Sequence, residues 1–139
     1  MKTSITTLLL CLSCLTTLAQ QSDYAQVEKT VSYYLDGGTN NDFETLKKAF
    51  HETATMKFIR NGEYKEVNAI EFFKNAVKPG PKQNRDTRIA YINVTGDVAS
   101  AKLEIDYETF SFIDYMNLIK IDGEWKVVNK IFNRQNKTK

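Results

Sequence analysis

Cysteine is nearly absent from the chain, and its position matters. The only two cysteines, Cys11 and Cys14, lie near the start. There, Lys2 precedes a short apolar run, and small residues up to Ala19 form a cleavage site, as in a secretory signal. The run is too short and too rich in threonine for a stable membrane anchor. We therefore predict a signal peptide over residues 1–19 and one exported domain over residues 20–139, in the periplasm or secreted.

Without its signal the chain has no thiol, which excludes a disulfide, a thiolate metal ligand and a cysteine nucleophile. Histidine is almost as rare, since His51 is the only one. A transition-metal site needs several such ligands, so we predict no metal. No glycine-rich loop opens a helix to hold a phosphate, and no Ser-His-Asp set is visible. We therefore expect no cofactor.

A large excess of charge is lacking too. Once Lys2 is removed, 18 basic and 17 acidic residues remain. A net charge near +1 argues against nucleic-acid binding, which depends on many phosphate contacts. About 120 residues suffice for one sizeable core. Proline is scarce, and only Pro79-Gly80-Pro81 divides the chain, between a helical first half and a strand-rich second half.

The first half contains three helix patterns and one hairpin. The first helix begins at Asp23 and ends at Gly37-Gly38. The second is capped by Asn41 and the third by Asn68. Between them, Asn61-Gly62 is a strong signal for a two-residue hairpin turn. We expect all three helices to cover one face of a sheet.

The second half predicts four long strands joined by two-residue turns at Gly96-Asp97, Glu108-Thr109 and Asp122-Gly123. Side chains alternate between the two faces of a strand, so these turns assign each residue to a face. One face is then almost entirely apolar. The combined pattern predicts an α+β fold in which helices pack on an antiparallel sheet.

Three polar side chains interrupt this apolar face: Arg88, Asp114 and Asn129. In the predicted register Asp114 lies between Leu103 and Ile131. A carboxylate there costs several kcal/mol unless it is paired, hydrogen-bonded or hydrated. Three interpretations of Asp114 stay open: a ligand contact, a general base, or a structural acid bonded to a helix or, through water, to Arg88. The predicted ligand-binding residues are Asp114, Asn129, Arg88, Tyr34, Tyr107, Met116 and Trp125.

The opposite face carries an apolar patch on the last two strands that no remaining element can cover. A contiguous exposed patch of this kind usually marks an interface, so we predict a homodimer. Alternatively, the stems of Lys126 and Lys130 shield the patch in a monomer. The predicted interface residues are Ile113, Tyr115, Ile119, Val128 and Phe132.

Three segments carry a resemblance to a known family: YYLDGG, NDFETLKKAFHETATM and, most specifically, DYMNLIKIDGEWKVVNKIF. They resemble the bacterial family of putative lumazine-binding proteins, within the nuclear-transport-factor-2-like superfamily. The resemblance implies a cone fold with three N-terminal helices packed on a curled antiparallel sheet. It also implies a small ligand in the cone, and the family name suggests one like a pterin. The superfamily includes isomerases, dehydratases, binding proteins and adaptors, so the fold leaves the function open.

Three functions fit these observations. The first is an exported protein that holds a small, partly aromatic organic molecule in the cone and forms a homodimer. The second is an isomerase or dehydratase of small ring compounds that uses Asp114 as general base. The third is a non-catalytic interaction module of the cell envelope whose cavity is filled. An open cavity favours the first two.

Overall fold

The computed structural model describes residues 23–138. A long helix occupies residues 23–39. The following elements are α2 (Phe43–Leu46), a 3-10 turn η1 (Lys47–Ala49), β1 (Phe50–Arg60), β2 (Glu63–Asn68), α3 (Ala69–Ala76), β3 (Asp86–Thr95), β4 (Val98–Asp106), β5 (Phe110–Ile121) and β6 (Glu124–Asn136). The predicted signal at residues 1–19 lies outside this range. Within residues 23–138, no helix is both long and apolar enough to cross a membrane.

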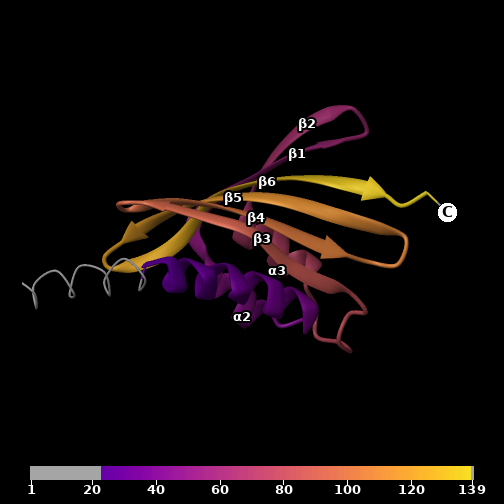
Figure 1. Ribbon diagram of the computed structural model, residues 1–139. Coiled ribbons are helices and arrows are strands. Elements are labelled where there is room, and N and C mark those ends of the chain that lie inside the picture. The colour runs from indigo at the N-terminus through magenta and orange to yellow at the C-terminus, as the bar shows by residue number, and fades with distance from the viewer. Residues whose placement is uncertain (1–22, 139) are drawn as a thin grey trace, which may run out of the picture.

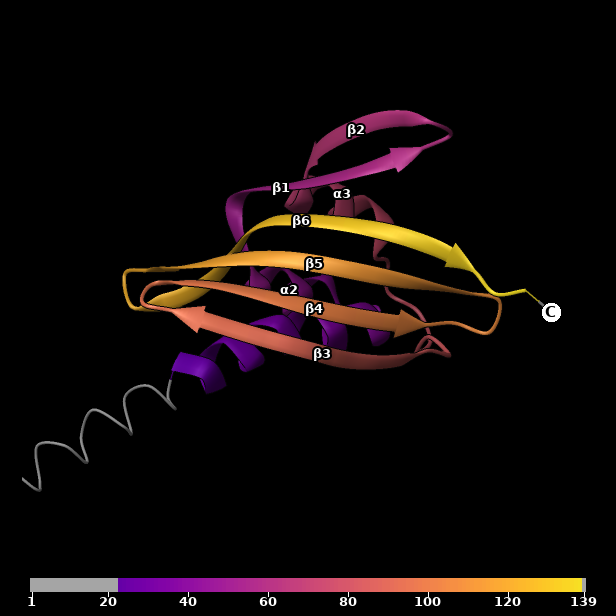
Figure 2. The same cartoon turned by 45° about the horizontal axis from the view of Figure 1, so that its top comes forward.

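The six strands form one sheet in the order β2-β1-β6-β5-β4-β3. The sheet curls over the long helix and α3, which lie on the same side of it (Figures 1 and 2). The predicted α+β class is therefore confirmed. The predicted antiparallel sheet is correct for every pair except β1 and β6, which run parallel. The sheet is therefore mixed, because β1 joins it from a helical connection and not from a hairpin with β6.

The predicted two-residue turns set the register of β3 to β6. At the last turn, Asp122 and Gly123 both have positive φ angles, of 50° and 83°, as a type I′ hairpin requires. At the middle turn, the backbone N–H of Tyr107 donates to the carbonyl of Phe110 at 2.9 Å. The pairs that flank the first and last turns are Thr95 with Val98 and Ile121 with Glu124.

The helices differ in part from the predictions. The second is a single turn followed by η1, and its cap is Asp42, whose side chain accepts from the N–H of Thr45 at 3.1 Å. Asn41 was therefore the wrong cap. The third helix is capped by Asn68 and follows the hairpin, as predicted, but its place between β2 and β3 differs from the three N-terminal helices that the family resemblance implied. The helices therefore do not all precede the sheet.

The first helix continues past Gly37 and Gly38, where the sequence predicted its end. The reason for a glycine here is close packing. A Cβ atom on Gly37 would lie 2.7 Å from the Cα of Leu46, and one on Gly38 would clash with the guanidinium of Arg85. These two glycines therefore allow the end of the helix to approach α2 and the segment before β3.

Two β-bulges change which side chains face the helices. In β3 the register shifts between Ile89 and Tyr91. In β6 Val128 is the extra residue, because Asn117 pairs with Asn129 while Leu118 pairs with Val127. A bulge exchanges the two faces of every later residue on its strand. Strict alternation was therefore wrong for the start of β3 and for β6 beyond Val127.

The covered face of the sheet and the helices enclose one apolar core. Its fully buried members include Val27, Val31, Leu46, Met56, Leu103, Ile105, Met116, Leu118 and Val127. Asp114 lies among them with no exposed surface. It is opposite Leu103, as predicted, but on the other side it is opposite Phe132 and not Ile131.

Candidate functional site

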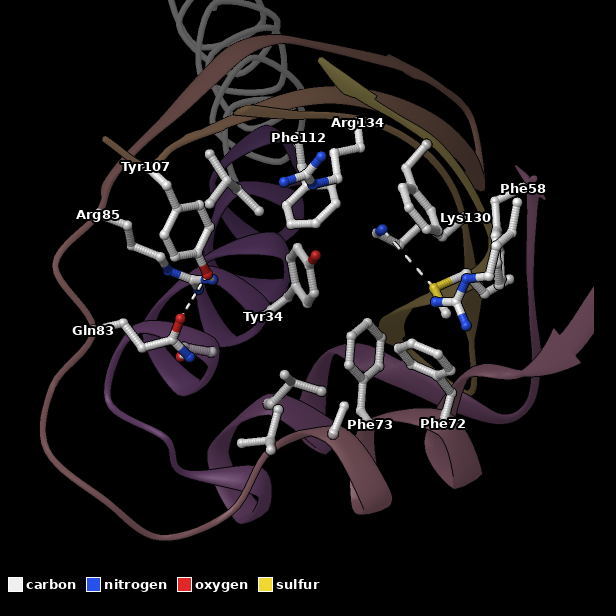
Figure 3. A pocket seen from close by; sticks show the side chains of 18 of the residues that line it. Tyr34, Phe58, Phe72, Phe73, Gln83, Arg85, Tyr107, Phe112, Lys130 and Arg134 are labelled. Carbon is white, nitrogen blue, oxygen red and sulfur yellow. Dashed lines mark hydrogen bonds between the residues drawn. The ribbon is translucent and has the colours of Figure 1, made fainter. Parts of the chain in front are cut away.

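A cavity of about 620 Å³ opens between the end of the long helix, α3 and the sheet (Figure 3). Its walls carry aromatic rings from five different elements and from the turn after β4. The aromatic residues that line it are Tyr34, Phe58, Phe72, Phe73, Tyr107, Phe112 and Phe132.

The charged residues of the lining are all basic: Arg60, Arg85, Lys130 and Arg134. Among the residues that the structure describes, no aspartate or glutamate lines the cavity. Within residues 23–138, none of the three arginines forms an ion pair with a carboxylate. The described wall of the cavity therefore carries positive charge that it does not itself neutralise.

Arg85 is fixed by neutral partners. Its guanidinium donates to the hydroxyl of Tyr107 at 2.9 Å, to the carbonyl of Leu35 at 3.0 Å and to the hydroxyl of Thr39 at 2.9 Å. The hydroxyl of Tyr107 in turn donates to Gln83 Oε1 at 2.6 Å. These bonds hold the arginine against one wall of the cavity, as Figure 3 shows. They fix its position and leave its positive charge intact.

Lys130 and Asp114 form a buried ion pair beside the cavity. The Nζ of Lys130 lies 3.0 Å from Oδ1 of Asp114. The hydroxyl of Tyr34 donates to the other carboxylate oxygen, Oδ2, at 2.7 Å. The Nζ also lies 4.0 Å from the ring centre of Phe132 and 3.9 Å from Sδ of Met56. Only 4% of the Lys130 side chain is exposed, so this charge is almost fully removed from water.

Burial shifts the pKa of two members of this network. It lowers the pKa of Lys130 from its ordinary value, and the attraction of the Asp114 carboxylate opposes the change. Burial also raises the pKa of Tyr34 well above its ordinary value, and the negative charge of Asp114 adds to the rise. Tyr34 therefore stays protonated and remains a hydrogen-bond donor, whereas the proton on Lys130 is held less tightly than on a surface lysine.

Of the seven predicted ligand-binding residues, Tyr34 and Tyr107 line the cavity. Asp114 faces the covered side, as the register predicted, but Lys130 and Tyr34 separate it from the cavity. Met116 is buried in the core. Trp125 lies beside the start of the long helix, where its Nε1 donates to Asp23 at 3.2 Å. For these last two residues the predicted place in the cavity was wrong.

Arg88 and Asn129 do not face the cavity either, because of the two bulges. Arg88 is on the outer face in an ion pair with Glu104, and 69% of its side chain is exposed. The side-chain amide of Asn129 donates to the hydroxyl of Thr55 in the neighbouring strand at 3.1 Å. Strict alternation placed both on the wrong face.

The most important residue that the sequence did not reveal is Lys130, which regular alternation placed on the outer face. The bulge at Val128 turns it inward. No clear signal for the bulge was present in the sequence, because Val128 also fits the apolar patch that we predicted on the outer face. Arg60 and Arg134 were also missed, since they lie near strand ends where alternation says little, and so was Arg85, which precedes β3.

The same bulge corrects the predicted interface. Phe132 lies on the cavity side, 4.9 Å between ring centres from Phe58, and is not on the outer face. Ile131 takes its place outside and is 47% exposed. Tyr115 and Ile119 are exposed on the outer face, as predicted. Ile113 and Val128 are half-buried. An apolar outer patch is therefore present.

The fold and its lined cavity define a cone of the nuclear-transport-factor-2-like class. An NTF2-like protein of unknown function from Shewanella baltica is 28% identical, with a TM-score of 0.74 over 82% of this chain and 94% of the other. The chain belongs to the family described as putative lumazine-binding, whose model matches residues 22–133.

Two further similar proteins have names that describe different functions, one an enzyme and the other an association domain. The aldolase FrzH of Cladobotryum sp. is 23% identical over 114 residues, which are 81% of this chain and 91% of FrzH. The association domain of CaMKII from C. elegans has a TM-score of 0.60 at 20% identity, over 83% of this chain and 95% of that domain. In residues 23–138, no three His, Cys, Asp or Glu side chains cluster to hold a metal ion.

Proposed function

We propose that the protein binds a small organic anion with a flat aromatic body in the cavity of the cone. The observation that carries this proposal is the lining: seven aromatic and four basic residues, with no acid among the described residues there. The volume of about 620 Å³ falls within the usual range of roughly 300–1,000 Å³ for small-molecule sites. The family description, which refers to lumazine, fits an aromatic ligand.

The arginines differ in how far they are buried, and this difference suggests how the anion enters the cavity. Arg60 and Arg134 are exposed, whereas Arg85 is half-buried. Charges at the opening attract an anion over several ångströms, and a guanidinium binds a carboxylate or phosphate through two parallel hydrogen bonds. Inside, the ligand ring can stack against Phe73 and Phe112, because offset or edge-on aromatic pairs are favourable.

Calorimetry with matched ligands tests the proposal. The naphthalene carboxylate 2-naphthoate and its amide have almost the same shape, and only the first is charged. We expect the carboxylate to bind more tightly by about 1.5–3 kcal/mol, the range for a hydrogen bond to a charged group, or roughly 10- to 100-fold. Equal affinities, or binding of uncharged lumazine alone, would show that the proposed anionic class is wrong.

Two arginine variants provide the control. Arg134→Gln removes a charge at the opening, and Arg88→Gln removes the same charge on the outer face. We expect the first to weaken binding of 2-naphthoate and the second to leave it unchanged. Added salt should weaken binding more for the wild type than for Arg134→Gln, because the variant has one charge fewer for the salt to screen. Equal losses in both variants would mean that only the net charge matters.

An enzymatic function is the second candidate, and the buried set of Lys130, Asp114 and Tyr34 favours it. The aldolase relative shares most of the chain length. An isomerase or dehydratase with Asp114 as a direct base fits less well, because Lys130 and Tyr34 stand between that carboxylate and the cavity. An inert module requires a filled cavity, and the open one argues against it.

Association as a homodimer through the outer face is part of the proposal. Tyr115, Ile119 and Ile131 form its exposed apolar surface, and one structural neighbour is an association domain. A charge buried unpaired in such a surface is costly. We expect sedimentation to give a dimer for the wild type and a monomer for Tyr115→Glu. A wild type that is monomeric at tens of micromolar would refute this part.

Export is also proposed, on the sequence of residues 1–19 alone. The mature chain then begins at or near Gln20 and acts in the periplasm or outside the cell, without cysteine. The intact mass of the protein recovered from the native host measures this directly. Retention of Met1 to Ala19, or a lipid on Cys14, would contradict it.

A further inference from the structure

We propose that the Nζ of Lys130 condenses with the carbonyl carbon of an aldehyde or ketone held in the cavity and forms an imine there. The inference rests on the proposed ligand cavity and adds a covalent step to it. It makes the protein a binder or catalyst for carbonyl compounds, the class to which an amine can couple reversibly.

The geometry places the amine where a ligand can reach it. Lys130 lines the cavity, and Figure 3 shows its nitrogen directed toward the interior, on the side where the hydroxyl of Tyr34 also points. Apolar groups surround the nitrogen: the ring of Phe132 at 4.0 Å and the sulfur of Met56 at 3.9 Å. A desolvated lysine in apolar surroundings is the usual form of an amine nucleophile.

The amine must lose a proton before it attacks, and the structure contains an acceptor. Oδ1 of Asp114 lies 3.0 Å from Nζ. The second oxygen of the same carboxylate accepts from Tyr34 at 2.7 Å. Because Tyr34 lines the cavity and Asp114 does not, the proton reaches a ligand oxygen through the tyrosine hydroxyl. The path is Lys130, Asp114, Tyr34 and then the ligand.

The step balances without a co-reactant. The C–N bond forms as the carbonyl π bond breaks, and the oxygen takes a proton from Tyr34, which is replaced from Asp114. This carbinolamine then loses its oxygen as water. Of the three protons on the ammonium group, two leave with that water and one stays on the iminium nitrogen. The product is therefore a cation beside the Asp114 carboxylate, and the buried ion pair keeps its charges.

A purely structural role explains the ion pair between Lys130 and Asp114 poorly. Two buried charges of this kind are often no more stabilising than apolar residues of the same size. A lysine that only balanced Asp114 would not need to face an open cavity. The arginines of the lining add selectivity, because they favour a carbonyl compound that also carries an anionic group.

Reductive trapping tests the inference. The probe is 4-carboxybenzaldehyde, which has an aromatic body, an anionic group and an aldehyde. The wild type is incubated with it and cyanoborohydride at neutral pH, digested and mapped by mass spectrometry. We expect one adduct, on the peptide that contains Lys130, before any other lysine is modified. Because the site is read on the wild-type chain, the result does not depend on a variant that folds.

Variants and a competitor complete the experiment. Lys130→Met should lose the adduct, and Lys126→Met, four residues earlier on β6, should keep it. Tyr34→Phe should slow trapping by a larger factor than it weakens calorimetric binding of terephthalate, which has no aldehyde. Terephthalate should also compete with trapping. A loss of terephthalate binding that equals the loss of trapping would reduce Tyr34 to a binding residue and overturn the proton path.

The outcomes separate this inference from the proposed function. If terephthalate binds and the aldehyde modifies surface lysines at random, the imine is wrong and the anion site stands. If Lys130 is trapped and neither terephthalate nor naphthoate binds, the amine stands and the anionic class is wrong. If Lys130→Met is modified as fast as the wild type at the same peptides, the amine has no special reactivity and the inference fails.

Discussion

The ion pair between Lys130 and Asp114 makes a strong prediction about stability. Asp114→Asn keeps the shape of the side chain but removes its charge. The carboxylate is fully buried and only 4% of the Lys130 side chain is exposed, so water cannot replace the lost partner. Breaking a buried pair by removing one partner costs about 3–5 kcal/mol. The total stability of a domain is roughly 5–15 kcal/mol, so we expect a much weakened fold.

A variant that replaces both Asp114 and Lys130 tests the buried ion pair more directly. Lys130→Met alone leaves Asp114 as an unpaired buried charge and should cost about 3–5 kcal/mol as well. The combination Asp114→Asn with Lys130→Met buries no charge, and the new methionine lies beside Met56 and Phe132. Only the asparagine amide then lacks a partner, at about 1–3 kcal/mol. The double variant should therefore be more stable than either single variant.

Urea denaturation measures these free energies, with circular dichroism and the fluorescence of the single tryptophan, buried Trp125, as two probes. Glu104→Gln is the matched control, because it breaks the ion pairs with Arg88 and Lys102 on the outer face, where surface pairs contribute about 0–1 kcal/mol. An Asp114→Asn protein within about 1 kcal/mol of the wild type, or simple additivity in the double variant, would mean that no buried ion pair exists.

Three further predictions concern other contacts. Because the pKa of Tyr34 is raised, the folded state keeps a proton that the unfolded state loses at high pH. The contribution of Tyr34 to stability is therefore complete below about pH 10 and declines above it. In alkaline urea titrations Tyr34→Phe should reduce this decline, and Tyr33→Phe should not. Gly37→Ala should lower stability by about 1–3 kcal/mol, the usual cost of overpacking, because its Cβ would meet the backbone of α2. The control Gly80→Ala should be neutral, because its Cβ would make only ordinary contacts, at 3.7 Å from Asn41 and 3.8 Å from the carbonyl of Lys78. The hydrogen bonds from Lys120 and Trp125 lower the pKa of Asp23, so Asp23→Asn should reduce the melting temperature at neutral pH. The difference in melting temperature between wild type and variant should vanish as the pH falls below the ordinary range of aspartate. A constant difference at all pH values would contradict this.

The sequence predicted most of the sheet because turn residues carry strong local information. Asp122-Gly123 and Asn61-Gly62 adopt the left-handed angles that two-residue hairpins require. The turns of the second half determine the pairing of Asp114 with Leu103, so the burial of that acid follows from local sequence. The second helix was predicted less well, since Phe43 to Phe50 has a helical pattern whose last part is a 3-10 turn that leads into β1. Local propensity could not show that the chain enters the sheet there.

The site itself depended on features that local rules do not describe. Arg85 lies in the segment between α3 and β3, and only the tertiary fold brings it against Tyr107. The charge of the cavity, and with it the class of ligand, could not be inferred from residues so far apart in the chain. A net charge near zero over the whole chain also hides a local excess of one sign.

The bulge at Val128 shows how one residue decides the chemistry. On a regular strand Asn129 would face the covered side and Lys130 the solvent, and Asp114 would have an amide for a neighbour. With one extra residue, Lys130 reaches Asp114 and Asn129 turns to Thr55. A neutral amide cannot act as a nucleophile toward a carbonyl group, whereas a desolvated amine can. The acid that interrupts the apolar face of the sheet is therefore best understood as the partner that makes a lysine tolerable inside the cone.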